Sequence, residues 1–178
     1  MSRLQQRPNT ASSADGSVEM CVDSPRPDIV VERMDTSRLL DASSPFGQRA
    51  QQRLRDERVI WLTTIGADGT PQPNPVWFLW DSSASSFLVY SLPDAQRLRH
   101  IERNPRVALH FDGNGQGGNI VVFGAEARRS TSDPSADQVT AYVDKYRDFI
   151  ARNFGTPEAF AQRYSVALRI TPDRVRGH

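Results

Sequence analysis

The chain has 178 residues, a formal net charge of +1 and 24% charged residues, which suit one domain with a real core but not two. Nothing in this balance calls for a nucleic acid or a membrane as partner, and no apolar run approaches the ~18 residues of a membrane-spanning helix. The single cysteine, Cys21, excludes an intrachain disulfide. The N-terminus lacks a signal-peptide apolar core, so we expect a cytoplasmic protein.

The first 35 residues are predicted to form a disordered tail, and residues 36–178 a folded domain. The segment from Met1 to about Val31 is rich in Ser, Arg, Asp, Gln and Pro and has few large apolar groups. Such a segment cannot bury enough surface to offset the entropy lost on ordering. The short apolar run 29–31 could still pack against a sheet edge.

The folded part opens with a predicted helix over Pro45–Arg58, followed by a β-rich strand, Val59–Ile65. The sequence Asp68-Gly69 marks a hairpin turn into a second strand, Pro73–Asp81. Prolines alternate at positions 71, 73 and 75, which is typical of an edge strand because a proline has no N–H to donate.

Three aromatic residues crowd the end of this second strand. Alternation places Val76, Phe78 and Trp80 on one face and Leu79 on the other, and one face must form the barrel interior. Trp77 has two interpretations. It either packs in a core or lines the active pocket.

The stretch Tyr90–Val107 carries the most distinctive pattern in the chain. A strand, Phe87–Ser91, turns into a short helix that ends before Pro105, with Ser91 and Asp94 as expected caps. Arginines in and beyond the first helical turn make its N-terminus a candidate phosphate site. The alternative is a solvated basic face on an ordinary amphipathic helix.

The remaining elements follow by pattern and by their turn residues. We predict a strand that begins at Val107, a glycine-rich loop from Asp112 to Gly118 and a strand over Asn119–Arg129. An amphipathic helix over Ser135–Asn153 follows, and then a second short helix that begins at Thr156 or Pro157 and runs to Tyr164. The last predicted strand covers residues 166–170 and ends before Pro172.

The residues that catalysis on its own would require are missing. No His, Cys and Asp side chains have the spacing of a metal site, and no Gly-x-Ser-x-Gly elbow is present. We therefore predict no metal and assign no catalytic residue. The chemistry is expected to come from a bound cofactor that the protein orients and shields.

Three segments, ADGTPQPNPVWFLWD, YSLPDAQRLRHIERNPRV and DGNGQGG, resemble the pyridoxamine 5′-phosphate oxidase-like split β-barrel proteins. Within that family they are most similar to the actinobacterial branch that uses the deazaflavin coenzyme F420. The resemblance covers about Arg53–Thr171. It implies a mainly β fold with flanking helices, an α+β protein of the FMN-binding split β-barrel type, that binds its cofactor as a homodimer.

The resemblance also implies the cofactor site. Arg97 replaces the lysine that holds the 5′-phosphate in flavin-binding members, and Gln96 stands where those members often have a second basic residue. A track of arginines suits the anionic tail of F420 better than a lone phosphate. The implied cofactor-binding residues are Asn74, Pro75, Val76, Trp77, Tyr90, Ser91, Gln96, Arg97, Leu98, Arg99, His100 and Gly118.

The resulting hypothesis is an oxidoreductase that uses reduced F420 to pass hydride to a small unsaturated or quinone-like substrate. The alternatives are an FMN-dependent enzyme of the same fold and a non-catalytic carrier of F420 or flavin. A nucleic-acid binder using the arginine-bearing helix fits the near-neutral charge poorly.

Overall fold

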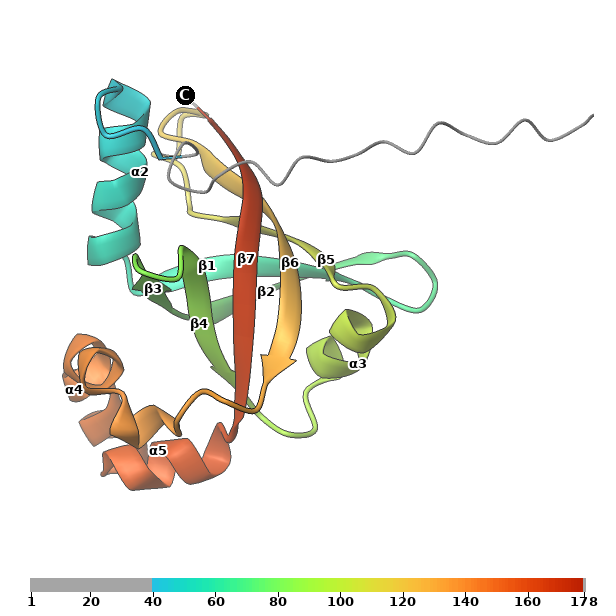
Figure 1. The fold of residues 1–178 in the computed structure, drawn as a ribbon, viewed down its shortest axis with the longest axis vertical. Helices are drawn as coiled ribbons and strands as arrows, with labels where there is room; N and C mark the ends of the chain where they lie inside the picture. The colour runs from blue at the N-terminus through green and yellow to red at the C-terminus, as the bar shows by residue number, and fades with distance from the viewer. Residues whose placement is uncertain (1–39, 178) are drawn as a thin grey trace, which may run out of the picture. The chain divides into compact units, whose positions relative to one another are not determined.

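The computed structural model describes residues 40–177 of the chain. The tail predicted over residues 1–35, and with it the 29–31 run, lies outside the described residues. Within residues 40–177, seven strands form one antiparallel sheet in the order β2-β1-β5-β6-β7-β4-β3, with helices around it (Figure 1). The strands are β1 Val59–Ile65, β2 Pro71–Trp77, β3 Leu79–Asp81, β4 Ser86–Ser91, β5 Arg106–His110, β6 Val121–Ser130 and β7 Val166–Gly177.

The two edge strands of this sheet are consecutive in sequence. β2 ends at Trp77, β3 begins at Leu79, and only Phe78 lies between them. The sheet must curl until its edges meet at Phe78, and this produces the split-barrel form. The sequence predicted one strand over Pro73–Asp81, which is wrong, because the chain leaves one edge of the sheet at Phe78 and joins the other.

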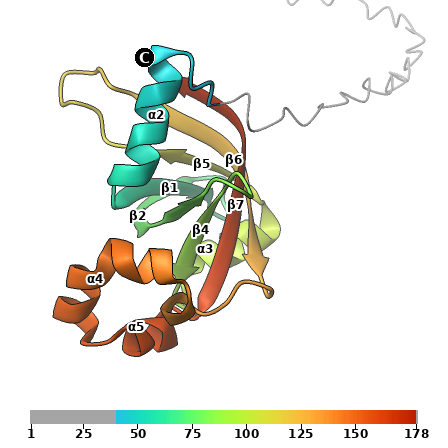
Figure 2. The same cartoon turned by 60° about the vertical axis from the view of Figure 1, so that its left-hand side comes forward.

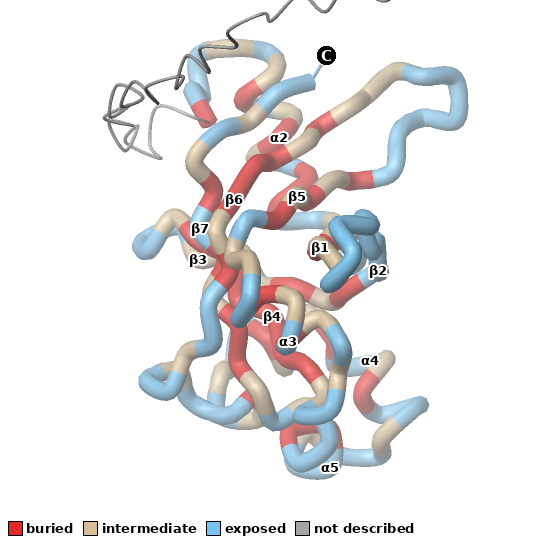
Figure 3. The backbone as a smooth tube through the Cα atoms, turned by 90° about the vertical axis from the view of Figure 1, so that its right-hand side faces the viewer, coloured by how far each residue is buried: buried red, intermediate tan, exposed pale blue. Residues whose placement is uncertain are grey.

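Alternation along this segment separates two apolar clusters, as predicted. Val76 and Phe78 are buried in the larger cluster, the barrel core, and Trp80 packs against it. Trp77 and Leu79 pack against the second cluster, which lies between the outside of the sheet and the helices near the chain's C-terminal end. The buried strand segments and the exposed hairpin of β1 and β2 are visible in Figure 3.

The helices are α2 Pro45–Asp56, α3 Gln96–Arg103, α4 Thr140–Phe154 and α5 Pro157–Arg163, with a 3-10 turn, Ala136–Gln138, before α4. α4 and α5 lie together beside β4 and β7 (Figure 2). α2 begins where the Ser44 hydroxyl accepts a hydrogen bond from the backbone N of Gly47. The single helix predicted over Ser135–Asn153 is interrupted at Val139, where the backbone is extended.

The bounds of the last two strands also differ from prediction. Pro172 does not end the last strand, since β7 runs on to Gly177. The register of β7 against β6 shifts between Gly124 and Ala125, opposite Pro172, and β4 pairs with β7 only as far as Ile170. Pro172 therefore lies at a bulge and beyond the last pair between β7 and β4, where the sheet does not need its backbone N–H. The strand predicted from Asn119 begins at Val121, because Asn119 adopts φ +59°.

The β1–β2 hairpin turns at Asp68-Gly69, as the sequence predicts. The Gly66 N–H donates to the Thr70 carbonyl at 2.9 Å, and Gly69 adopts φ +82°, a conformation that a side chain disfavours. β2 is an edge strand, as its alternating prolines predict.

Candidate functional site

A pocket with a cavity volume of about 190 Å³ opens between β2, β4, the start of α3, and the pair α4–α5. The lining residues are largely aromatic and include one charged side chain. They are Pro75, Val76, Trp77, Tyr90, Leu92, Arg97, Tyr142, Phe154, Phe160 and Tyr164.

The aromatic wall is built around Trp77. Its ring stacks on Tyr146 at 4.6 Å between centroids and 4° between planes, and on Phe160 at 5.5 Å. Phe154 meets the same ring edge-on at 6.3 Å. Trp77 packs against a core cluster and also lines the pocket. That this pocket is the active one stays a prediction.

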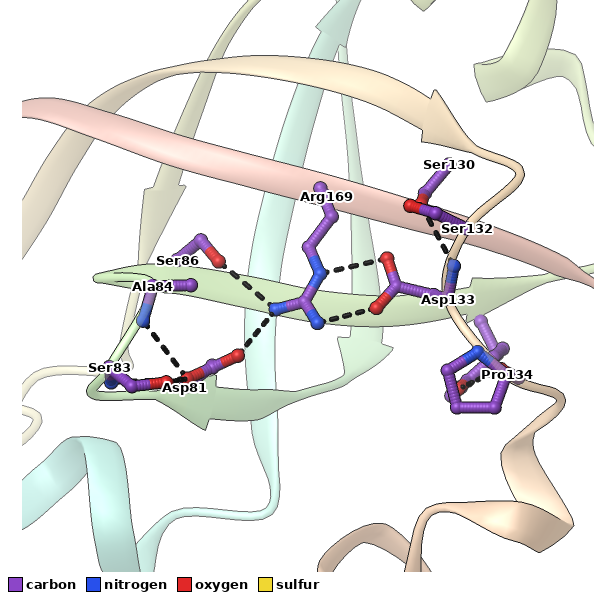
Figure 4. A network of polar contacts seen from close by, with 10 residues as sticks. Asp81, Ser83, Ala84, Ser86, Ser130, Ser132, Asp133, Pro134 and Arg169 are labelled. Atoms are coloured by element: carbon purple, nitrogen blue, oxygen red, sulfur yellow. Dashed lines mark hydrogen bonds and ion pairs between the residues drawn. The ribbon is translucent and has the colours of Figure 1, made fainter.

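Tyr90 and the segment before α4 fix the position of the helices that complete this wall. The Tyr90 hydroxyl donates to the Pro134 carbonyl at 2.7 Å, and burial raises the pKa of Tyr90 to about 12. Next to Pro134, Asp133 accepts two hydrogen bonds from Arg169 of β7 (Figure 4). The chain between β6 and α4 is therefore tied to both β4 and β7.

Arg169 also reaches the turn between β3 and β4. Its Nη1 lies 2.9 Å from Asp81 Oδ2 and 3.1 Å from the Ser86 hydroxyl. A hydrogen bond from the Ser83 hydroxyl and the nearby Arg169 guanidinium lower the pKa of Asp81 to about 2. Hydrogen bonds from the same guanidinium also lower the pKa of Asp133. This network joins β3, β4 and β7 to the segment before α4.

Arg97 is the charged residue of the pocket. Its side chain is half-buried, and among the described residues it has no hydrogen bond and no carboxylate within ion-pair distance. Burial lowers the pKa of its guanidinium, yet an arginine remains charged at physiological pH. A desolvated cation without an acidic partner favours an anionic ligand.

Tyr142 contributes a hydroxyl to the same region. The residue is fully buried, and its hydroxyl has no hydrogen-bond partner among residues 40–177. Burial raises the pKa of Tyr142 well above its ordinary value, so the phenol stays protonated.

Five of the twelve residues predicted for the cofactor site come together in this pocket, namely Pro75, Val76, Trp77, Tyr90 and Arg97. They derive from β2, β4 and the first turn of α3, which the chain brings side by side. Whether they contact a cofactor is still a prediction.

The other seven predicted residues lie elsewhere. Asn74, Gln96 and Arg99 are exposed, Leu98 is buried in the barrel core, and Ser91 is buried at the end of β4 without lining the pocket. His100 Nδ1 lies 2.9 Å from the Thr64 hydroxyl. Gly118 closes its loop by donating to Asn114 Oδ1.

The expected caps of α3 are wrong. Ala95 occupies the cap position and provides no side-chain hydrogen bond, while Ser91 is a residue of β4. The helix N-terminus is therefore not closed by its own sequence. In this first turn the Leu98 N–H donates to the Ala95 carbonyl at 3.0 Å, and no side chain caps the helix.

Sequence reasoning did not assign Leu92, Tyr142, Phe154, Phe160 and Tyr164 to the pocket. Tyr142 was recognised only as part of an amphipathic helical face. The available signal was the number of aromatic residues in α4, with Phe160 in α5 and Tyr164 directly after it.

A model of the pyridoxamine 5′-phosphate oxidase family matches residues 46–178, which include every strand and every residue of the pocket. The chain belongs to the pyridoxamine 5′-phosphate oxidase family. The family binds flavin-type cofactors and includes oxidoreductases, and its split-barrel fold is the fold seen here.

Solved structures show the same fold at low identity. An F420 reductase is 22% identical, with 71% of this chain and 94% of that chain covered and a TM-score of 0.55. A conserved hypothetical protein of Mycobacterium tuberculosis is 20% identical, with coverages of 72% and 81% and a TM-score of 0.57. HutZ, the heme storage protein of Vibrio cholerae, is 18% identical, with coverages of 72% and 92% and a TM-score of 0.50. No curated protein matches the sequence.

His, Cys, Asp and Glu side chains form no group of three that could hold a metal ion within residues 40–177. In the same range, no helix is long and apolar enough to cross a membrane.

Proposed function

We propose that this pyridoxamine 5′-phosphate oxidase family protein is an oxidoreductase that uses the reduced deazaflavin F420, with the pocket around Arg97 as its cofactor and substrate site. The observation that carries the proposal is Arg97 itself, a half-buried cation without an acidic partner beside a wall of aromatic rings. Such a wall suits a planar ring system, and such a cation suits its phosphate.

The residues present fit this group. Arg97 would hold the phosphate, the edge strand β2 would border the ring through Pro75–Trp77, and the indole of Trp77 would shape the substrate side. Reduced F420 supplies a hydride to an unsaturated or quinone-like acceptor. The protein would contribute orientation and exclusion of water, and no side chain is assigned as proton donor.

Preference for F420 over FMN rests on charge. α3 carries Arg97, Arg99 and Arg103, with Glu102 as its acidic residue. Glu102 pairs with Arg129 of β6 at 2.9 Å, so it does not neutralise the arginines of its own helix. An extended anionic tail gains more from several exposed cations than one phosphate does. The presence of an F420 reductase among the structural neighbours also supports F420 over FMN.

We also propose a homodimer that completes the site. One chain encloses about 190 Å³, less than the roughly 300–1,000 Å³ of typical ligand pockets. In β1, Val59 is 42% exposed and Trp61 and Thr63 are half-buried, which leaves apolar surface for a second copy.

Titration of ligand-free protein with oxidised F420 and with FMN tests the cofactor. We expect F420 to bind at least about tenfold more tightly, equivalent to ~1.4 kcal/mol. Tighter FMN binding would replace the proposal with the FMN-dependent alternative. Mixing the complex of protein and reduced F420 with a quinone then separates an enzyme from a carrier, because only an enzyme accelerates the return of the oxidised spectrum.

A further inference from the structure

Lys145 of α4 is the only lysine in the sequence, whereas 21 basic residues are arginines. An arginine cannot lose its proton under ordinary conditions, but a lysine can when its surroundings disfavour the charge. The surroundings of Lys145 therefore decide whether its side-chain amine can lose a proton.

The Lys145 side chain is half-buried against apolar and aromatic groups. Its Nζ lies 3.9 Å from the centre of the Phe78 ring and 5.9 Å from that of Tyr146. Contact with a ring face favours the ammonium form, so burial acts against it. Its hydrogen bond is a long one, 3.5 Å to the Leu54 carbonyl of α2. Among the described residues, no carboxylate lies within 4.0 Å of Nζ.

Charged groups surround the amine from two sides, but they do not form a single close partner. From the end of α2 come Asp56 and Glu57, whose charges favour the protonated amine, and the following Arg58, whose charge opposes it. Arg55 of α2 lines one surface hollow together with Lys145. From α4 itself, Asp144 is occupied by Arg147 in an ion pair, and Asp148 lies one turn along. Burial is the largest influence, and it lowers the pKa of Lys145 to about 8.

The Lys145 side chain also borders the protein surface. Lys145 lines two neighbouring surface hollows, one with Leu54, Leu79 and Trp80 and the other with Arg58 and Phe149. A small reagent can approach from either hollow without the aromatic pocket having to open, because neither hollow shares a lining residue with that pocket.

We propose that Lys145 is a nucleophilic amine and a site of covalent acylation by small acyl donors. The Nζ lone pair attacks the acyl carbon, a C–N bond forms, and the bond to the leaving group breaks with its electron pair. The amine's proton passes to solvent. The product is a neutral amide beside Phe78, the residue at which the sheet edges meet.

Acetylation of the full-length folded protein by N-acetoxysuccinimide, with mass spectrometry of the Lys145 peptide, tests the proposal. The control is the same lysine in protein unfolded by guanidinium, where its pKa is near the ordinary ~10.4. At about pH 7.5 the neutral fraction is far larger in the folded state. We expect acetylation of the folded protein to be at least about tenfold faster, with a rate that levels off above a midpoint near pH 8.

Two variants sharpen the result. Lys145→Arg should remove the labelled peptide, and Arg58→Gln should move the midpoint to higher pH because one opposing charge is lost. A folded-state rate equal to or below the unfolded rate would overturn the proposal and leave Lys145 as a packing residue. A rate that still rises steeply through pH 10 would overturn it as well.

Discussion

The hydroxyl of Tyr146 lies 2.8 Å from both the backbone N and the backbone O of Phe78. It is also 2.7 Å from the Arg58 carbonyl, just before β1. One side chain of α4 thus accepts a hydrogen bond from the backbone N–H of the single residue between the two edges of the sheet, and its one hydroxyl proton is shared between the Phe78 and Arg58 carbonyls. The same ring carries Trp77 on its face, so closure of the barrel and placement of the pocket wall depend on one tyrosine.

Tyr146→Phe should destabilise the protein by about 2–3 kcal/mol, because the Phe78 N–H would be left buried without an acceptor. Tyr142→Phe is the matched control, one turn away on α4, and its hydroxyl has no partner among the described residues. That variant should keep its stability or gain up to about 1 kcal/mol. Urea unfolding of both variants gives the comparison, and equal losses would contradict the role assigned to Tyr146.

Arg169→Met should cost about 2 kcal/mol of stability at neutral pH. The side chains of Asp133 and Asp81 are 9% and 28% exposed, so both carboxylates would lose their cation while partly desolvated. The exposed pair Arg147–Asp144 provides the control. Arg147→Met should change the free energy of unfolding by less than about 0.5 kcal/mol.

The stability contributed by the Arg169 network should fall at acid pH. The pKa values of Asp81, about 2, and of Asp133 are lower in the folded protein than in the unfolded chain. Their contribution to stability is therefore complete above about pH 4–5 and is lost as pH falls toward about 2. Between these limits, Arg169→Met should lose less stability than the wild type. Parallel slopes in urea titrations at several pH values would show that the network contributes nothing.

Local pattern was enough to predict those parts of the fold that neighbouring residues determine. The strand Val59–Ile65 and the turn at Asp68-Gly69 were predicted correctly, because side-chain alternation and a positive φ are local properties. The break at Phe78 could not be predicted, since a strand that changes edges has the same alternation as one that does not. The continuation of β7 past Pro172 depends on where β4 stops pairing, which is a tertiary fact.

Some residues of the candidate site could likewise be predicted from local pattern, and others could not. Arg97 and Trp77 were singled out by a motif, and the fold brings them into one pocket. Gly118 was chosen for its glycine-rich loop, but Asn114 and Gly118 close that loop on each other. Phe160 and Tyr164 were missed because their contribution depends on how α5 packs against β4 and β7, and no local pattern encodes that packing.

Assembly is tested at the exposed face of β1. Thr63 lies between Pro73 of β2 and Ala108 of β5 and is half-buried in one chain. We expect light scattering to show a dimer at micromolar concentration, and Thr63→Arg to give a folded monomer, because it places a charge within the proposed interface. A wild-type monomer would contradict both the dimer and the shared site. A dimeric Thr63→Arg variant would move the interface to another face.

Arg97→Ala tests the phosphate assignment most directly. If Arg97 anchors the phosphate, the variant loses a charge-assisted contact worth roughly 1.5–3 kcal/mol, and F420 affinity should fall by about ten- to a hundredfold. Arg97→Lys should recover much of the affinity, because it keeps the charge. Arg103→Ala, at the exposed last residue of α3, is the control and should cost less.

Stability separates this loss from misfolding. Arg97 has no carboxylate partner among the described residues, and burial disfavours its charge, so Arg97→Ala without cofactor should unfold at the same urea concentration as wild type or slightly higher. Fluorescence titration at two salt concentrations completes the test. A phosphate contact predicts that wild type loses more affinity with salt than Arg97→Ala does, since the variant has one fewer ionic contact to screen. Equal affinities at both salt concentrations would remove Arg97 from the cofactor site, and with it the main support for F420.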